Sequence, residues 1–252
     1  MADHPNHYRF HRPILWDNGN SEWKYSNGGT ANLVRLCGEF FILTAKHCLE
    51  KSKHGWTLED CRIPWRIQSE AYCKIGRGVG FSVRPGDPVS GDCELLHCDV
   101  QIHRLEGPSC PAEELEPGEF LDIVSFDPSP VPLSRSLSGF PAFDQEIDYE
   151  NAEIRGIGWT IHGRVEATTD ENIHRFHSQS LRGVDANGYS GGLITCDVLG
   201  NVSLEGICLQ GSGSVGIDFV HFLGIDVLAN QLGRAYEELA GVRAADSESN
   251  LR

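Results

Sequence analysis

The apolar segments of this chain are short, and turn-forming residues interrupt almost all of them. The 252 residues include 28 glycines and 12 prolines, which are spread along the chain rather than gathered in one place. Short apolar runs bounded by such residues are typical of strands joined by tight turns. The sequence therefore predicts an all-β fold, and its length allows one large domain or two small ones.

The clearest pair of strands is expected at residues 31–36 and 40–45, because Cys37-Gly38-Glu39 between them is short enough for a hairpin turn. The proline-rich stretch 126–132 cannot lie in a central strand, and we take it as the boundary between two halves. Further short strands are expected near residues 64–76, 80–84, 99–105, 119–125, 137–140, 152–158, 160–166, 174–181, 191–196, 202–210 and 215–220.

Residues 222–240 follow a different period. Their apolar side chains fall at helical spacing, which predicts an amphipathic C-terminal helix carrying Leu223, Val227, Leu228, Leu232, Tyr236 and Leu239 on one face. Residues 1–24 show no clear period and are predicted to form an N-terminal arm, and residues 242–252 a flexible tail. The expected organisation is thus an arm, a first β unit over 25–127, a second with its helix over 128–241, and a tail.

Charge and cysteine content limit the partners and the compartment. A formal net charge of -15 repels phosphate backbones and anionic lipid, so neither nucleic acid nor a membrane is an expected partner. The first seven residues lack the apolar core of a secretory signal, which predicts a cytoplasmic protein. Nine cysteines leave at least one thiol unpaired unless a second chain pairs with it, whereas in a reducing compartment all nine stay reduced.

Three segments carry candidate chemistry. His47 ends an apolar run, Asp99 opens a predicted strand, and Ser190 lies in the glycine-rich sequence Gly188-Tyr189-Ser190-Gly191-Gly192. Taken singly, each is typical of ordinary structure: a packed histidine, a turn aspartate and a serine in a tight turn. Together they fit nucleophilic catalysis. A serine hydroxyl needs a base, a histidine serves near neutral pH, and an aspartate orients the imidazole.

The three segments, in this order, resemble the motifs of the chymotrypsin/trypsin family of serine peptidases. His47 and Asp99 are 52 residues apart, and Asp99 and Ser190 are 91 apart. The resemblance implies two six-stranded antiparallel β-barrels with a C-terminal α-helix, the first barrel holding His47 and Asp99 and the second Ser190. It also implies an oxyanion hole made by the N–H groups of Gly188 and Ser190.

The resemblance extends to substrate binding. Leu209, Gln210 and Gly211 stand where the family has its substrate-pairing strand, and the segment from Gly216 to Asp218 fits the far wall of its specificity pocket. The position that holds the pocket acid in trypsin, six residues before the serine, is Val184, with Asp185 next to it. Two interpretations stay open: Asp185 or Asp218 selects a basic residue, or both are solvated turn acids.

Two departures from the secreted enzymes stand out. Tyr189 occupies the position of the aspartate that pairs with a newly cut N-terminus, and no Ile-Val-Gly-Gly segment is present, as in bacterial-type trypsin-like domains made without a pro-peptide. The usual disulfide partner of Cys48 is replaced by Gly28 or Gly29. Cys37 is no substitute, because the strand from residue 40 to 47 separates the two cysteines by roughly 25 Å.

Another cluster surrounds Asp99 and is rich in metal-ligating residue types: Cys93, His97, Cys98, His103 and Cys110. Its spacing matches no tight zinc motif, so thiols and surface histidines are the favoured interpretation, and no metal or organic cofactor is expected.

The leading hypothesis is a serine endopeptidase, a hydrolase with a narrow protein substrate and an activity controlled by a partner protein. The competing hypothesis is a trypsin-like fold that binds peptide or protein without catalysis, because Tyr189 distorts the oxyanion loop.

Overall fold

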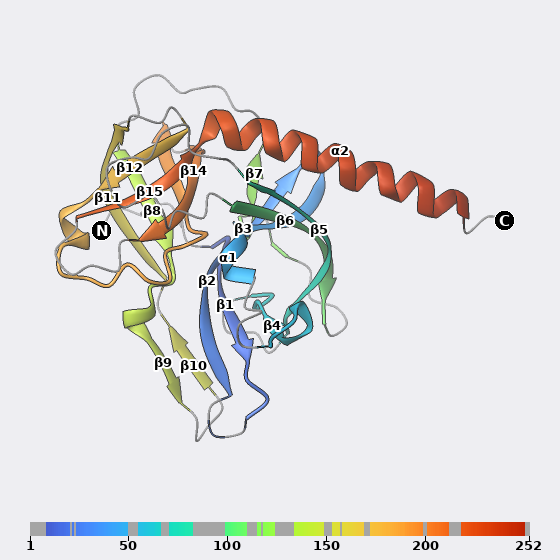
Figure 1. The fold of residues 1–252 in the computed structure, drawn as a ribbon, viewed down its shortest axis with the longest axis horizontal. Coiled ribbons are helices and arrows are strands. Elements are labelled where there is room, and N and C mark those ends of the chain that lie inside the picture. Colours follow the sequence, from blue (N-terminus) through green and yellow to red (C-terminus); the bar gives the residue numbers. More distant parts are fainter. Residues whose placement is uncertain are drawn as a thin grey trace.

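The computed structural model describes residues 9–20, 22, 24–49, 55–66, 71–82, 99–109, 115–116, 118–123, 134–148, 153–156, 158–168, 172–198, 201–211 and 218–249. The chain is mostly β (Figure 1), as the interrupted apolar runs predict. The proline-rich boundary at 126–132 lies outside the described residues.

The first half forms a seven-stranded sheet in which six strands follow the order β4-β1-β2-β3-β6-β5 and β7 pairs with β2 in parallel. Its strands are β1 (His11–Asp17), β2 (Tyr25–Leu36), β3 (Glu39–Ala45), β4 (Cys61–Arg62), β5 (Cys73–Ser82), β6 (Asp99–Pro108) and β7 (Leu121–Ile123). The edge strands β4 and β5 are linked by one isolated bridge between Pro64 and Tyr72. Two backbone hydrogen bonds flank this bridge, from Cys73 to the carbonyl of Ile63 at 2.7 Å and from Trp65 to that of Ala71 at 2.8 Å, and the pairing does not extend into a continuous ladder between β4 and β5. A closed first barrel, as the resemblance implies, is therefore not seen among the described strands.

The second half does form a closed six-stranded antiparallel barrel, in the order β11-β12-β15-β14-β13-β8. The barrel strands are β8 (Ser134–Gly139), β11 (Trp159–Ala167), β12 (Ile173–His177), β13 (Leu193–Val198), β14 (Asn201–Gly211) and β15 (Phe219–Gly224). A separate two-stranded ribbon, β9 (Gln145–Asp148) with β10 (Glu153–Gly156), projects away from it in Figure 1. The all-β class with a six-stranded barrel and a terminal helix is confirmed.

The C-terminal helix α2 (Ile225–Ser249) connects the two halves. It leaves β15, crosses β14 and packs against β5 and β6, and its far end extends beyond both sheets (Figure 1). One apolar cluster joins side chains from both halves and the helix, among them Leu43, Leu193 and Leu232. The helix thus contributes to a core that neither half completes alone.

Three local features differ from, or refine, the sequence expectations. Cys37 and Gly38 form the hairpin turn with φ of 51° and 83°, the left-handed conformation that two-residue hairpins favour. The expected arm contains β1, and its Pro13 is tolerated because β4 pairs only with Leu15 and Trp16. The remaining short elements are α1 (Lys46–Leu49), η2 (Leu58–Asp60), η4 (Ala142–Asp144) and η5 (Gln179–Leu181). Within the described residues, no helix has both the length and the apolar character needed to cross a membrane.

Candidate catalytic site

His47 lies in α1, the single helical turn that follows β3 directly. The turn is anchored because Cys48 and Leu49 are buried, while the Nδ1 atom of His47 is itself shielded from solvent. Gly29 on β2 faces this turn so closely that a Cβ there would lie 2.6 Å from the Sγ of Cys48. Gly29 therefore fills the position opposite Cys48 and leaves Cys48 in the thiol form.

Asp99 reaches the same place through the register of β6. Val100 pairs with Ala45, the last residue of β3, so Asp99 lies one position further, beside the start of α1. Only the backbone of Asp99 belongs to the described part of the chain, and its side chain lies outside it. The strand register thus brings the aspartate and histidine segments together, as the family motifs require.

Ser190 lies in a pair of consecutive tight turns. The N–H of Tyr189 donates to the carbonyl of Ala186 at 3.2 Å, and the N–H of Gly192 donates to the carbonyl of Tyr189 at 2.7 Å. Gly188 and Gly191 have φ of 94° and 83°, a conformation that glycine adopts without strain. A Cβ on either would lie within 2.3 Å of a backbone oxygen. The glycines of the motif are therefore required by the shape of the turn.

The serine turn contacts the histidine turn directly. The carbonyl oxygen of Ser190 accepts a hydrogen bond from the Sγ of Cys48 at 3.5 Å. On its other side the turn is joined to β14, because Gly191 donates to the carbonyl of Cys208 at 2.8 Å and Cys208 donates to that of Gly192 at 2.7 Å. Strands of both halves thus meet at Ser190.

Two N–H groups of the serine turn are available for a ligand. Among the described residues, neither Gly188 nor Ser190 donates its N–H to any acceptor. Tyr189 between them is only 1% exposed and packs within the apolar cluster of the second barrel. Burial raises the pKa of Tyr189, so the phenol stays neutral. The tyrosine is an apolar anchor of the turn rather than a charged partner.

The proposed substrate strand continues from this point. Leu209 is buried, and the backbones of Gln210 and Gly211 extend β14 by pairing with His221 and Val220. The side chain of Gln210 lies outside the described part of the structure, as does the whole of Gly216.

The two candidate pocket acids have different surroundings. Asp185 is exposed, and its carboxylate accepts hydrogen bonds from the N–H and the side-chain amide of Asn187 at 3.0 and 2.9 Å, next to the half-buried Val184. Asp218 leads into β15, and its carboxylate lies 3.6 Å from the Nδ1 of His177. Asp185 is thus an acid of a local turn, whereas Asp218 belongs to a charged cluster.

The sequence interpretation missed that cluster. The Nε2 of His177 lies 2.9 Å from the carboxylate of Glu166, so the imidazole stands between two acids contributed by other strands. Phe219 packs against His177, and the guanidinium of Arg175 lies 4.8 Å from the centre of the Phe219 ring. The register that pairs His177 with Phe219 creates the cluster, and no local motif signals it.

No metal centre accompanies these groups in the described part of the chain, which contains no set of three or more histidine, cysteine, aspartate or glutamate side chains able to hold an ion. Of the cysteine- and histidine-rich segment near Asp99, only the backbone of His103 is described; Cys93, His97, Cys98 and Cys110 lie outside.

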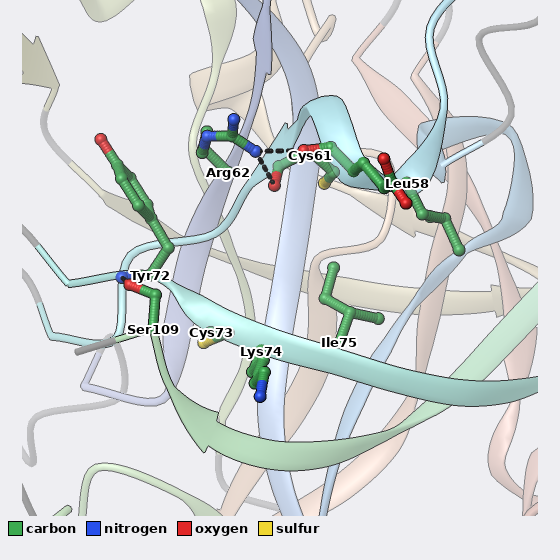
Figure 2. A pocket seen from close by; sticks show the side chains of 9 residues that line it. Leu58, Cys61, Arg62, Tyr72, Cys73, Lys74, Ile75 and Ser109 are labelled. Atoms are coloured by element: carbon green, nitrogen blue, oxygen red, sulfur yellow. Dashed lines mark hydrogen bonds between the residues drawn. The ribbon is translucent and has the colours of Figure 1, made fainter. Parts of the chain in front are cut away.

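A separate hollow of about 290 Å³ opens between the two edge strands of the first sheet. Figure 2 shows Cys73, Lys74 and Ile75 on one side and Cys61 with Arg62 on the other. Burial raises the pKa of both thiols to about 12, so they are protonated and weakly nucleophilic at neutral pH. None of the lining residues belongs to the segments of His47, Asp99 or Ser190.

Comparison with known proteins does not add an assignment: no protein-family model matches the chain, and no curated protein matches it.

Proposed function

We propose that this protein is a serine endopeptidase with the two-barrel architecture of the chymotrypsin type and the triad His47, Asp99 and Ser190. The observation that carries the proposal is the contact between the serine turn and the histidine turn, through the carbonyl of Ser190 and the thiol of Cys48. The backbone register of β6 supports the third member, because it brings Asp99 beside the same turn. The chemistry then follows from the residue types.

In the proposed reaction the Oγ of Ser190 attacks the scissile carbonyl, and His47 takes the hydroxyl proton and returns it to the leaving amine. The carbonyl oxygen becomes an oxyanion facing the N–H groups of Gly188 and Ser190. Water then attacks the acyl-enzyme while His47 accepts its proton; the bond between the acyl carbon and the Oγ of Ser190 breaks, the carboxylic product leaves, and His47 returns the proton to that Oγ. Asp99 holds the imidazole in the required tautomer. No step requires a metal or an organic cofactor.

The substrate in this proposal is an extended peptide that pairs with Leu209, Gln210 and Gly211 by strand addition. Val184, Asp185, Gly216 and Asp218 are the proposed surroundings of its side chain at the cut. Both acids have a neighbour within the chain, Asn187 for Asp185 and His177 for Asp218, and peptide-library cleavage tests whether either of them selects a basic residue before the cut.

A reducing compartment is part of the proposal. The described cysteines Cys37, Cys48, Cys61, Cys73, Cys196 and Cys208 are all thiols, and Gly29 removes the usual disulfide partner of Cys48. Control by a partner protein in the cytoplasm replaces control by a pro-peptide. Counting thiols in the denatured protein tests the compartment, and two or more disulfides would overturn it.

Labelling with a fluorophosphonate tests the activity. We expect wild-type protein to become labelled at Ser190, and Ser190→Ala and His47→Ala to abolish labelling. Ser203→Ala and His162→Ala, which change the same residue types outside the proposed site, are expected to label like wild type. A wild-type protein that never labels, and that Ser190→Ala leaves unchanged, would support the binding-module alternative instead.

A further inference from the structure

Two buried polar side chains of β2 hold the serine turn from the other half of the molecule. The Oγ1 of Thr30 donates to the carbonyl of Gly188 at 2.7 Å and accepts from the N–H of Phe140 at 2.9 Å. The Nδ2 of Asn32 donates to the carbonyls of Gly191 and Leu43 at 2.6 and 2.8 Å. Both side chains are fully shielded from solvent. We call Thr30 and Asn32 the β2 clasp.

Further hydrogen bonds fix the β2 clasp itself. The Oγ1 of Thr44 donates to the carbonyl of Thr30 at 2.7 Å. Because the amide nitrogen of Asn32 faces two carbonyls, its oxygen faces the Nδ1 of His11, 2.5 Å away, and that nitrogen carries the ring proton. Buried side chains with all of these bonds satisfied have a single low-energy arrangement.

Within the serine turn, every carbonyl from Asn187 to Gly191 accepts a hydrogen bond. The carbonyls of Gly188, Ser190 and Gly191 accept hydrogen bonds from β2. The donor to the carbonyl of Ser190 is the N–H of Thr30, at 2.9 Å. Those of Asn187 and Tyr189 accept from Ala142 and Gly192, each at 2.7 Å. The direction of each carbonyl in the turn is therefore fixed.

Fixed carbonyls determine where the remaining N–H groups point. In a planar trans peptide the N–H points opposite to the carbonyl of the same peptide unit. The N–H of Gly188 is thus directed away from Ala142, which binds the preceding carbonyl, and the N–H of Ser190 away from Gly192. These are the two N–H groups that no described residue uses.

We propose that Thr30 and Asn32 are positioning residues that keep the serine turn in its reactive conformation, which makes an N-terminal cleavage unnecessary for forming the oxyanion hole. This inference rests on the proposed function. Control of the site then lies in how the two halves contact each other. Tyr189, at the position of the activating acid, is buried among apolar side chains and forms no ion pair in the described part of the structure.

The test compares Thr30→Val, which removes only the hydroxyl at constant shape, with Thr30→Ser, which retains it. Thr195→Val is the matched control, because Thr195 is equally buried and its Oγ1 has no hydrogen-bond partner among the described residues. The readouts are the fluorophosphonate labelling rate of Ser190 and amide hydrogen exchange across residues 186–192. Asn32→Asp provides a second variant that removes donors to the turn if Thr30→Val does not fold.

We expect Thr30→Val to slow labelling about 10- to 100-fold. This loss is at most about as large as the loss of rate caused by removing an oxyanion-hole donor itself. Exchange across 186–192 should rise about tenfold, which corresponds to one lost hydrogen bond. Thr30→Ser and Thr195→Val should stay within about threefold of wild type for both readouts. The midpoint of the pH profile of labelling, which reports the histidine, should be unchanged in Thr30→Val.

The outcomes separate the inference from the proposed function. If neither Thr30→Val nor Asn32→Asp changes the labelling rate or the hydrogen exchange of the turn, the proposed role of the β2 clasp is wrong. The endopeptidase proposal would still stand. A wild-type protein that never labels would overturn the endopeptidase and, with it, the catalytic meaning of the β2 clasp, even if the exchange of the turn responds as expected. Thr195→Val slowing labelling as much as Thr30→Val would also contradict the inference, because any buried hydroxyl would then matter equally.

Discussion

Gly29 lies next to the histidine turn, and its lack of a side chain leaves room for the Sγ of Cys48. The residue has φ of 129°, and a Cβ there would lie 3.4 Å from the Cβ of Cys48. Disulfides span Cβ separations of about 3.5–4.5 Å, so the distance is close to that of a disulfide, whereas the positive φ and the carbonyl oxygen of Ser190, 3.0 Å from the added Cβ, oppose a side chain here. The chain therefore retains the geometry of a cross-link without the second sulfur.

We accordingly predict that Gly29→Cys forms a disulfide with Cys48 under mild oxidation. Peptide mass mapping without reductant would detect the cross-link. The gain in stability should be small, because a non-glycine residue with positive φ carries about 1–3 kcal/mol of strain. Gly19→Cys is the control: its φ of 64° is also positive, but no atom beyond its chain neighbours lies within 4 Å of the added Cβ, so it should remain a thiol. Two unlinked thiols at positions 29 and 48 would show that the strands are farther apart.

The site residues that could be identified from the sequence are those that lie in short local motifs. His47, Asp99 and Ser190 stand out because their chemistry is concentrated in short segments. Thr30 and Asn32 do not, since they recognise backbone carbonyls, which every residue has, and their partners at Gly188 and Gly191 are 158 and 159 positions away. Polarity alone does not single them out either, because the same strand also holds Ser26, Asn27 and Arg35.

Among the elements, α2 has the largest effect on the joint core. Leu228 and Leu232 are fully buried in the cluster that side chains of both halves share. We predict that Leu232→Ala lowers the free energy of unfolding by about 2–5 kcal/mol, because it removes a packed side chain and leaves a cavity. Urea titration followed by circular dichroism measures the change.

The same helix provides the control for this prediction. Glu238→Ala, at an exposed position of α2, should change the free energy of unfolding by less than about 0.5 kcal/mol. Equal losses from both substitutions would contradict the prediction, because burial in the joint core would then not distinguish the two positions.

Element ends were harder to predict than element types. The apolar period of α2 stops at Leu239, yet the helix continues to Ser249, since the following residues include alanine, arginine and glutamate, which favour helices without needing a buried face. β1 was missed because residues 1–24 show no clear apolar period, and its pairing with the distant strands β2 and β4 leaves no local signal.

For the whole molecule, the buried thiols predict sensitivity to alkali. Burial raises the pKa of Cys61 and Cys73 to about 12, whereas the thiols of the unfolded chain have a pKa of about 8.5. Between these values the unfolded state loses protons that the folded state retains, so the free energy of unfolding falls as pH rises. Each such thiol contributes a slope of about 1.4 kcal/mol per pH unit.

Urea unfolding at several pH values from 8 to about 10.5 measures this slope. Cys73→Ala should make the dependence on pH less steep by the contribution of one thiol. Cys37→Ala, at an exposed hairpin position, should leave the slope unchanged. A slope that Cys73→Ala does not alter would mean that other groups cause the alkaline loss.

At this scale the sequence predicts two β-rich halves and a terminal helix but not how completely each half closes. Closure depends on pairing between distant strands, as between β8 and both β11 and β13, and composition does not specify such registers. The first half shows the same dependence, because next to β4 and β5 the chain pairs at one isolated bridge, Pro64 with Tyr72, and the described strands do not close.

The separation between the two sides of the β2 clasp has a consequence for the newly made protein. Thr30 leaves the ribosome long before Gly188, and the carbonyls that it binds do not exist until more than 150 residues later have been added. Until those residues have been added the serine turn cannot form, and a truncated product that ends before it carries His47 and Asp99 but lacks Ser190. Under the proposed function, the site can therefore form only after the residues of the serine turn have been added to the chain.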